Sequence, residues 1–238
     1  RWSDIPQSLR REATRSILNH IGCALGSCRD EVIERALVVM DRFSGPRVAT
    51  VVGRPERLDI LAAASLNAMS SNVLNFDDTH VPTVIHPSAP VVPPLLAWSE
   101  HRRLSGPELL HAFILGVEAA CRIGKSVSPW HYSHGFLITA TCGVFGSAAA
   151  IGKTLGLTAQ QMTWALGTAA NQSCGLVESL PDMAKSIAVG NSARNGIMAA
   201  LLAEQNFTGG ERPIEGTFGF AQVTGQQADL SKITSGLG

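Results

Sequence analysis

The sequence predicts an all-α fold, and three observations support this prediction. Apolar residues recur at intervals of three to four along most of the chain, as they do on the buried face of an amphipathic helix. Only one short β-branched run, residues 48–52, lies between glycines and prolines, and it is too isolated to form a large sheet. Hydrophobic residues make up 45% of the chain but aromatic residues only 5%, which indicates helices of small side chains packed closely together.

Three helices are expected in the first third of the chain. The first ends near Gly26 and carries an apolar stripe formed by Ile5, Leu9, Ala13, Ile17, Ile21, Ala24 and Leu25. The second covers residues 31–43 and is broken by Gly45 and Pro46. The third follows Pro55 and covers roughly residues 56–74.

Capping signals place the helices of the remaining chain. Ser105 and Glu108 form a capping box with a proline in the first turn, and they begin a helix that continues through Ile123. Thr158 and Gln161 repeat this device before another helix. A last strong helix is expected over residues 192–205, followed by the terminating pair Gly209 and Gly210, and a short helix stopped by glycine is expected within residues 229–238.

Residues 135–152 carry no charge and are the segment that most resembles a membrane span. They consist largely of Thr, Ser, Gly and Ala, which favour a helix buried among close-packed neighbours over one that faces lipid. Nineteen basic residues balance nineteen acidic ones, so no overall charge attracts nucleic acid or an anionic membrane. We therefore expect no membrane and no nucleic acid among the partners, but a small molecule or a second copy of the chain.

The five cysteines are an odd number without CxxC spacing, and they lie in apolar helical contexts. A reduced thiol in such a context behaves as a small hydrophobic group. We expect a reducing compartment, cytoplasmic or, in a eukaryote, mitochondrial, and neither a metal site nor a cofactor.

The segment Asn75-Phe-Asp-Asp-Thr-His80, followed by His86-Pro-Ser88, concentrates titratable and polar groups in fourteen residues of a chain in which only 16% of residues are charged. Two carboxylates and two imidazoles so close together are typical of an acid/base site. The spacing is equally compatible with a polar loop whose aspartates cap the next helix. Both interpretations stand at this level.

Four segments of the chain together resemble the MmgE/PrpD family, in its order and spacing and over nearly the whole length. They are Asn75-Phe-Asp-Asp-Thr-His80 with His86-Pro-Ser88, Thr141-Cys-Gly-Val-Phe-Gly-Ser-Ala-Ala-Ala150, Lys185 with Val189-Gly-Asn-Ser-Ala-Arg-Asn-Gly196, and Phe207-Thr-Gly209. The family includes 2-methylcitrate dehydratase, cis-aconitate decarboxylase and iminodisuccinate epimerase. The resemblance implies a large all-helical domain over residues 1–238, a smaller α/β domain that would follow residue 238, and a homodimer.

The resemblance also implies chemistry at a carbon next to a carboxylate, on a small di- or tricarboxylate. Such a reaction builds up negative charge, so it needs a nearby cation and a proton-transfer group with a pKa near neutrality. His86 fits the proton-transfer role and Lys185 the charge-stabilising role. The remaining assignments are Asp77 and Asp78 as catalytic carboxyl groups, and Asn75, Thr79, His80 and His134 as substrate-binding residues. The alternative is structural: a capping Thr79, a surface Lys185 and a His86 that satisfies a turn.

The chain departs from the family pattern at several positions. Asn75 stands where relatives usually carry an aspartate, and one residue is inserted between Thr79 and His86. Leu137 and Ala188 stand where relatives often carry histidine. Three explanations follow: one of His131, His134 and His80 takes over the lost role, the substrate differs, or catalysis is impaired.

The expected function is a lyase reaction of the dehydratase type. A decarboxylase or an epimerase of a related polycarboxylate is the first alternative, since epimerisation needs no acid for a leaving group. A non-catalytic relative that keeps the helical scaffold for dimerisation or binding is the second.

Overall fold

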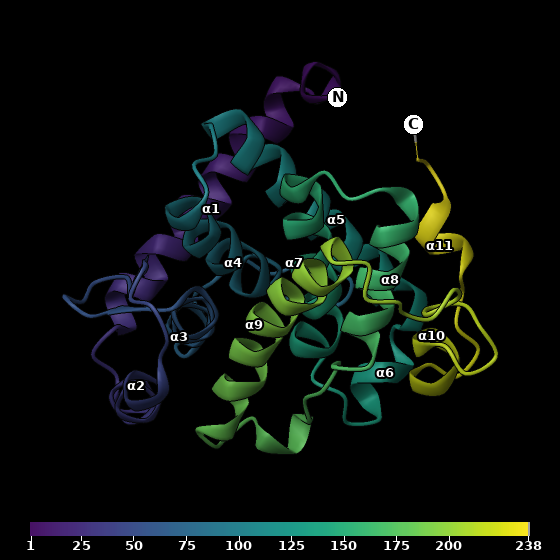
Figure 1. Cartoon of the computed structure of the whole chain (residues 1–238). Helices are drawn as coiled ribbons and strands as arrows, with labels where there is room; N and C mark the ends of the chain where they lie inside the picture. Colours follow the sequence, from purple (N-terminus) through teal and green to yellow (C-terminus); the bar gives the residue numbers. More distant parts are fainter. Residues whose placement is uncertain (238) are drawn as a thin grey trace.

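A computed structural model describes residues 1–237 and confirms the all-α prediction (Figure 1). The long helices are α1 (Gln7–Ser27), α2 (Glu31–Phe43), α3 (Ile60–Asn72), α4 (Ser88–His101), α5 (Gly106–Val127), α7 (Ile138–Leu155), α8 (Ala159–Ala170) and α9 (Ala184–Glu204). The short elements are η1 (Trp2–Asp4), α6 (Trp130–Ser133), η2 (Val177–Ser179), α10 (Phe220–Thr224) and α11 (Ser231–Thr234). The β-branched run supplies β1 (Ala49–Thr50), which pairs antiparallel with β2 (Arg57–Leu58) in the one sheet of residues 1–237.

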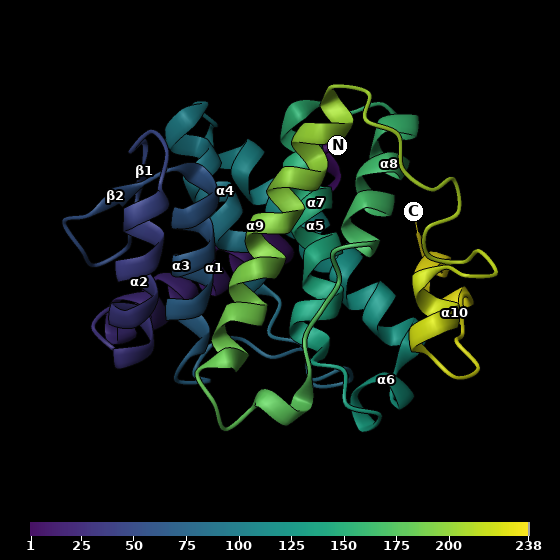
Figure 2. The same ribbon diagram turned by 60° about the horizontal axis from the view of Figure 1, so that its bottom comes forward.

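Helix α7 is the centre of the helical packing and lies between α5 and α9. Helix α9 also packs along α3 and α8, so that α3, α9, α7 and α8 stand side by side with roughly aligned axes in Figure 2. The segment after α3 and the segment before α9 both lie at the lower edge of that view. This arrangement brings two stretches more than a hundred residues apart to the same end of the bundle.

Small residues allow these helices to approach closely. A Cβ added at Gly116 of α5 would lie 2.7 Å from the carbonyl oxygen of Gly146 in α7, closer than real Cβ atoms come to a backbone oxygen. The alanine- and glycine-rich composition is therefore explained by backbone contact between helices. The uncharged segment that contains Gly146 is the buried helix α7, as predicted.

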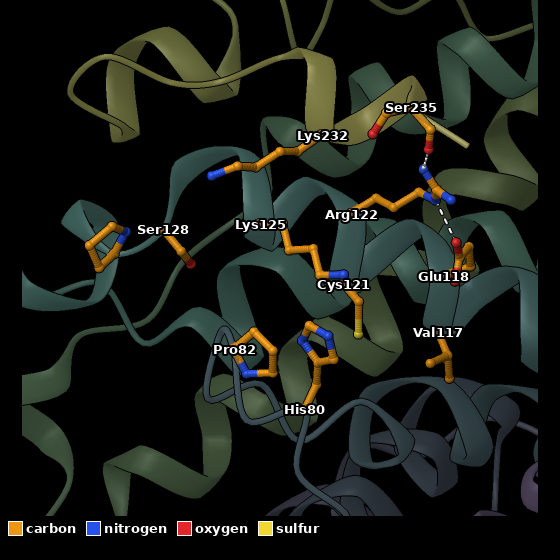
Figure 3. A pocket seen from close by; sticks show the side chains of 11 residues that line it. His80, Pro82, Val117, Glu118, Cys121, Arg122, Lys125, Ser128, Lys232 and Ser235 are labelled. Atoms are coloured by element: carbon orange, nitrogen blue, oxygen red, sulfur yellow. Dashed lines mark hydrogen bonds and ion pairs between the residues drawn. The ribbon is translucent and has the colours of Figure 1, made fainter. Parts of the chain in front are cut away.

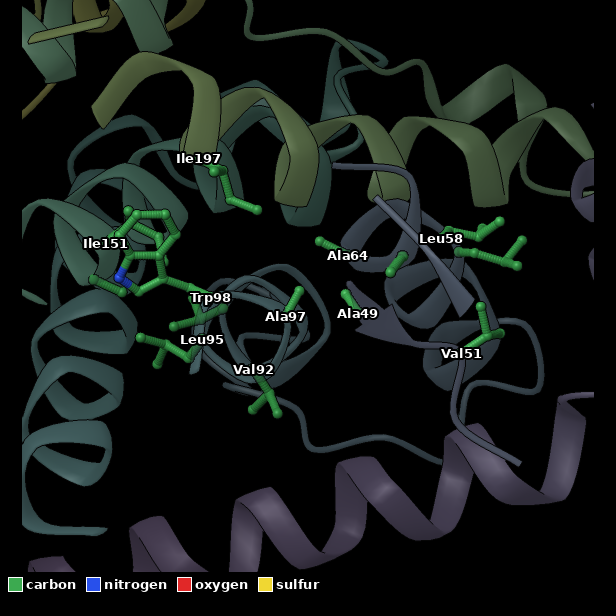
Figure 4. Close-up of a cluster of buried hydrophobic side chains, with 14 of the residues drawn as sticks. Ala49, Val51, Leu58, Ala64, Val92, Leu95, Ala97, Trp98, Ile151 and Ile197 are labelled. Carbon is green, nitrogen blue, oxygen red and sulfur yellow. The ribbon is translucent and has the colours of Figure 1, made fainter. Parts of the chain in front are cut away.

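The largest apolar core fills the space between α3, α4, β1, β2 and the far ends of α7 and α9 (Figure 4). Leu58, Leu95, Ile151 and Ile197 are among its fully buried members. Within residues 1–237 no helix combines the length and the apolar character that a membrane crossing requires.

In the first half of the chain, the predicted start of one helix is wrong and another helix is absent from the prediction. Helix α3 begins at Ile60, because Arg57 and Leu58 pair with β1 and Asp59 caps the helix through the backbone N–H groups of residues 61 and 62. Helix α4 was not predicted, because three prolines interrupt its helical pattern in the sequence. It forms nevertheless and is buried over most of its length, since tertiary packing outweighs the lost hydrogen bonds.

The beginning of α9 is the boundary that matters for the site. The helix starts at Ala184, two turns before the predicted residue 192, and so places Lys185 in its first turn. It ends at Glu204, one residue before the predicted end at 205. Gly209 and Gly210 instead lie against α8, where a Cβ at Gly209 would meet the carbonyl oxygen of Trp164 at 2.5 Å. The capping boxes at Ser105 and Thr158 are confirmed.

The predicted C-terminal helix over 229–238 is the short α11, and Gly236 adopts a φ of 66° after it. Gly238 lies outside the described residues.

Candidate functional site

The loop between α3 and α4 carries most of the predicted site residues and is held against α1. Asn19 of α1 clamps it from both sides: its Oδ1 accepts the N–H of Asp78 at 3.0 Å, and its Nδ2 donates to the carbonyl of Phe76 at 3.2 Å. Farther along, the N–H of His80 donates to the carbonyl of Ile85 at 2.8 Å and closes a turn. These contacts fix which side chains face inward.

Asp77 and Asp78 have different surroundings although they are neighbours. Asp78 caps the start of α4, with Oδ1 accepting the N–H of Ser88 at 3.1 Å and Oδ2 accepting its hydroxyl at 2.6 Å. Burial raises the pKa of Asp78, and the two bonds from Ser88 partly offset that rise. Since both oxygens face the end of a helix, the capping interpretation holds for Asp78, and we do not retain it as a catalytic group.

Asp77 instead faces His86, and its side chain is fully buried. Its Oδ1 lies 3.2 Å from Nδ1 of His86, and Oδ2 accepts a hydrogen bond from the side-chain amide of Asn72 at 2.8 Å. The hydroxyl of Thr79 lies 3.3 Å from the same ring nitrogen, and the hydroxyl of Thr139 accepts the backbone N–H of His86 at 3.1 Å. The imidazole is thus held with Nδ1 toward two oxygen atoms.

The pKa of His86 reflects two opposing effects. Burial by itself lowers the pKa, but the negatively charged carboxylate of Asp77, 3.2 Å from Nδ1, outweighs it, so the net shift is upward from the usual value. A histidine in this position carries a proton to higher pH than a free imidazole does.

This shift predicts how stability depends on pH. A histidine whose pKa rises on folding contributes stability fully below its unfolded pKa of about 6.5, and loses that contribution as pH rises through the higher folded value. We expect His86→Gln to lower the free energy of unfolding most at acidic pH, by about 1 kcal/mol or more, with the loss shrinking above neutrality. Urea unfolding at pH 5.5 and pH 8.5 measures this difference. In an Asp77→Asn background the pH dependence of the loss should disappear; its persistence there would contradict the pairing.

Lys185 reaches the same place from the first turn of α9. It is 7% exposed, and its Nζ donates to the backbone carbonyl of Asn72 at 3.0 Å and to Oδ1 of Asn75 at 2.5 Å. Within residues 1–237 no carboxylate lies within 4.0 Å of this ammonium group. Burial lowers the pKa of Lys185, and the charge of Asp77 opposes that fall. A buried cation held by neutral oxygens is well suited to receive an anionic group from a substrate.

Asn72 connects the two halves of the cluster and was missed in the sequence. Its side-chain amide holds Asp77, and its backbone carbonyl accepts Lys185. The only signal was an asparagine in the last turn of a helix, five residues before the paired aspartates. We use the name anion cluster, after the anionic substrate group that Lys185 is suited to receive, for Asn72, Asn75, Asp77, Thr79, His86 and Lys185.

His80 has surroundings different from those of the anion cluster. Its Nδ1 is 2.7 Å from the hydroxyl of Thr83, and burial together with the charge of Lys125 lowers its pKa. Figure 3 shows His80 and Lys125 pointing toward one another, with Lys232 extending over the same space. This cavity of about 640 Å³ has neither His86 nor Lys185 in its lining, so we do not retain His80 as a residue of the anion cluster.

The two histidines before Leu137 do not replace the lost imidazole. His134 is exposed, and its ring stacks on that of Trp130 with 3.8 Å between the ring centroids. Its Nδ1 lies 3.0 Å from the backbone carbonyl oxygen of Trp130. His131 is fully buried, with its nitrogens 2.7 Å from the carbonyl of Thr224 and 2.7 Å from the hydroxyl of Thr141. His134 is therefore a surface residue and His131 a core residue.

The two positions at which relatives often carry histidine lie together. Leu137 and Ala188 belong to one buried apolar group that also includes alanines of α3, α4 and α7. A Cβ at Gly175 would lie 3.3 Å from Cβ of Leu137 and 3.4 Å from Cβ of Ala188. The loss of two polar groups is thus matched by direct apolar packing next to Lys185.

The described residues leave little scope for a metal centre. Within residues 1–237 no group of three His, Cys, Asp or Glu side chains is arranged to hold a metal ion. In the anion cluster, only Asp77 and His86 belong to these residue types.

Known proteins support the assignment that these motifs suggested. The chain is 30% identical to cis-aconitate decarboxylase of Aspergillus terreus over 255 residues, which cover 99% of this chain and 51% of that protein. It is 31% identical to the cis-aconitate decarboxylase of Mus musculus over 216 residues, covering 88% of this chain and 44% of the relative. The human protein of the same name is 31% identical over 218 residues, which cover 88% of this chain and 45% of that protein.

The chain spans about half the length of the curated relatives it matches. The family model described as the MmgE/PrpD N-terminal domain matches residues 1–233. An all-helical architecture agrees with that description. The chain therefore belongs to the MmgE/PrpD family, and residues 1–233 correspond to its N-terminal domain.

Proposed function

We propose that the protein containing this chain is a lyase that acts on a small polycarboxylate, at a carbon next to a carboxylate. The observation that carries the proposal is the joint anchoring of the Lys185 ammonium and the Asp77–His86 pair on Asn72. One group supplies a buried positive charge with no carboxylate within 4.0 Å among the described residues, and the other a histidine whose pKa is raised. Both are what a reaction through a carbanion requires.

Among such reactions, we propose decarboxylation of cis-aconitate or a close analogue, because the relatives named above carry that activity. Lys185 would bind a carboxylate that remains on the substrate. The bond from the reacting carbon to the departing carboxyl carbon breaks, its electron pair stays on the substrate, and carbon dioxide leaves. Charged His86, oriented through Nδ1 by Asp77, then delivers the Nε2 proton to the carbanion.

The test is a panel of polycarboxylates that includes cis-aconitate, incubated with the full-length protein in deuterated water. We expect release of carbon dioxide and one deuterium in the product, at one of the two carbons that share the electron pair of the allylic carbanion. Elimination of water from a hydroxylated substrate would instead assign a dehydratase within the same class. If no substrate of the panel shows exchange or elimination, the lyase proposal is rejected and a scaffold role is favoured.

An epimerase or isomerase is the second candidate. Leu137 and Ala188 leave His86 as the one imidazole of the anion cluster, and exchange of a proton at one carbon demands less than loss of a leaving group. Incorporation of deuterium without loss of carbon dioxide or water would assign this reaction.

Two further expectations remain proposals. The family resemblance implies a homodimer. The five unpaired cysteines, Cys23, Cys28, Cys121, Cys142 and Cys174, fit the reducing compartment expected from the sequence.

A further inference from the structure

Asn72 is the one residue that touches both functional halves of the anion cluster. It is 1% exposed and ends α3, so its side chain and its backbone carbonyl point to different partners. The amide nitrogen donates to Oδ2 of Asp77 at 2.8 Å. The backbone carbonyl, which any residue would supply, accepts a hydrogen bond from the ammonium group of Lys185 at 3.0 Å.

We propose that the side chain of Asn72 is a positioning residue for proton transfer: it fixes the Asp77 carboxylate, which in turn holds Nδ1 of His86 and aims Nε2 at the substrate. This assignment rests on the proposed function, in which His86 moves the proton. Asn72 itself is too deeply buried to touch substrate.

The geometry around Asp77 supports this role. Its carboxylate is fully buried, and Oδ1, the atom 3.2 Å from His86, accepts no aligned hydrogen bond. The Asn72 amide is therefore the one well-aligned donor to this carboxylate within residues 1–237. Without it the carboxylate could rotate about its side-chain bonds, and the ring of His86 would lose its fixed acceptor.

The charged and titratable groups around Asp77 make His86 its main cationic partner. His86 and Asp78 lie on the same loop, while His20 on α1 and Lys185 on α9 interact with the carboxylate only through longer-range electrostatics. His20 is fully buried and neither ring nitrogen has a hydrogen-bond partner, so burial lowers its pKa to about 4 despite the charge of Asp77. A neutral His20 leaves the negative charge of Asp77 to His86 and Lys185.

The two roles of Asn72 can be separated by substitution. Asn72→Leu removes the amide but keeps the backbone carbonyl that holds Lys185. We expect kcat to fall about 10- to 100-fold, the effect of losing a hydrogen bond to a charged group, while KM changes less than threefold. Asn171→Leu is the control, because Asn171 is the C-cap of α8, donates its side-chain amide to the carbonyl of Gly167 and lies outside the anion cluster. It should leave both constants unchanged.

A spectroscopic measurement makes the result independent of turnover. Two oxygens face Nδ1 of His86, so the neutral ring should carry its proton there, and ¹⁵N chemical shifts should report the Nδ1–H tautomer. In Asn72→Leu the Nε2–H form should become substantially populated. If Asn72→Leu changes the tautomer but the wild type catalyses no reaction on the panel, the proposed function fails, while the control of the His86 ring by Asn72 stands.

A double-mutant cycle with Asp77→Asn keeps the proposal falsifiable should Asn72→Leu be unstable. If Asn72 acts through Asp77, Asn72→Leu should lower kcat little further once Asp77→Asn is present. Additive losses in this cycle, or an unchanged His86 tautomer and kcat in Asn72→Leu, would overturn the assignment.

Discussion

Replacing Lys185 with methionine is expected to lower kcat/KM for the polycarboxylate substrate by about 100- to 1,000-fold, the usual cost of removing one group that stabilises developing negative charge. Methionine has a similar length and keeps the buried stem of the side chain. Only the ammonium group and its bonds to Asn72 and Asn75 are lost. Steady-state kinetics of the full-length variant measures the effect.

The same variant should unfold no more easily than the wild type at neutral pH. Burial lowers the pKa of Lys185. A lysine whose pKa falls on folding makes the folded state less stable, and this cost is fully present below the folded pKa, where the ammonium group stays charged. Methionine removes this cost, which offsets the two lost hydrogen bonds. Lys125→Met, in the cavity that His80 lines, is the matched control and should leave turnover unchanged. Full activity in Lys185→Met would contradict the role of the ammonium group.

Gly116→Ala is expected to lower the free energy of unfolding by about 3 kcal/mol. The added Cβ would lie 2.7 Å from the carbonyl oxygen of Gly146 and 2.7 Å from Cγ1 of Val91, so α5 and α7 would have to separate. Because α7 also supports α9, this separation should be felt through the whole bundle. The midpoint of urea unfolding reports the change.

Gly22→Ala is the control for this substitution. Gly22 is also in a helix, but a Cβ there meets nothing within 4 Å. Alanine should therefore raise the free energy of unfolding by up to about 1 kcal/mol through its helix propensity. Equal effects of the two substitutions would show that the contact between α5 and α7 is looser than described.

The motifs that resembled the family marked residues that lie close together in the structure, but they did not predict the partners of each residue. His86, Lys185, Asp77, Asn75 and Thr79 do lie together. Which of two adjacent aspartates faces the histidine depends on the direction that each side chain takes in a loop. Contacts with Asn19 and Ser88 set that direction; Asn19 does not stand out in the sequence, and nothing in the motif marks Ser88 as the partner of Asp78.

The histidines illustrate the same limit of sequence reasoning. His80 and His86 are six residues apart in one loop, yet their rings have different partners: Thr83 for His80, and Asp77 and Thr79 for His86. His131 and His134 are three residues apart, and one is buried while the other is exposed. Spacing in a loop carries no fixed period, so it cannot assign a face as helical spacing does.

By itself the sequence determined what local interactions decide: the helical class, the capping boxes at Ser105 and Thr158, and the buried nature of α7. These follow from apolar periodicity and from side chains that bond to backbone groups within one turn. Tertiary structure alone decided that proline-containing α4 is a helix, that α9 begins early enough to bury Lys185, and that Asn72 joins it to Asp77 and His86. Asn72 and Lys185 are separated by 113 residues, and the packing of α3 against α9 brings them together.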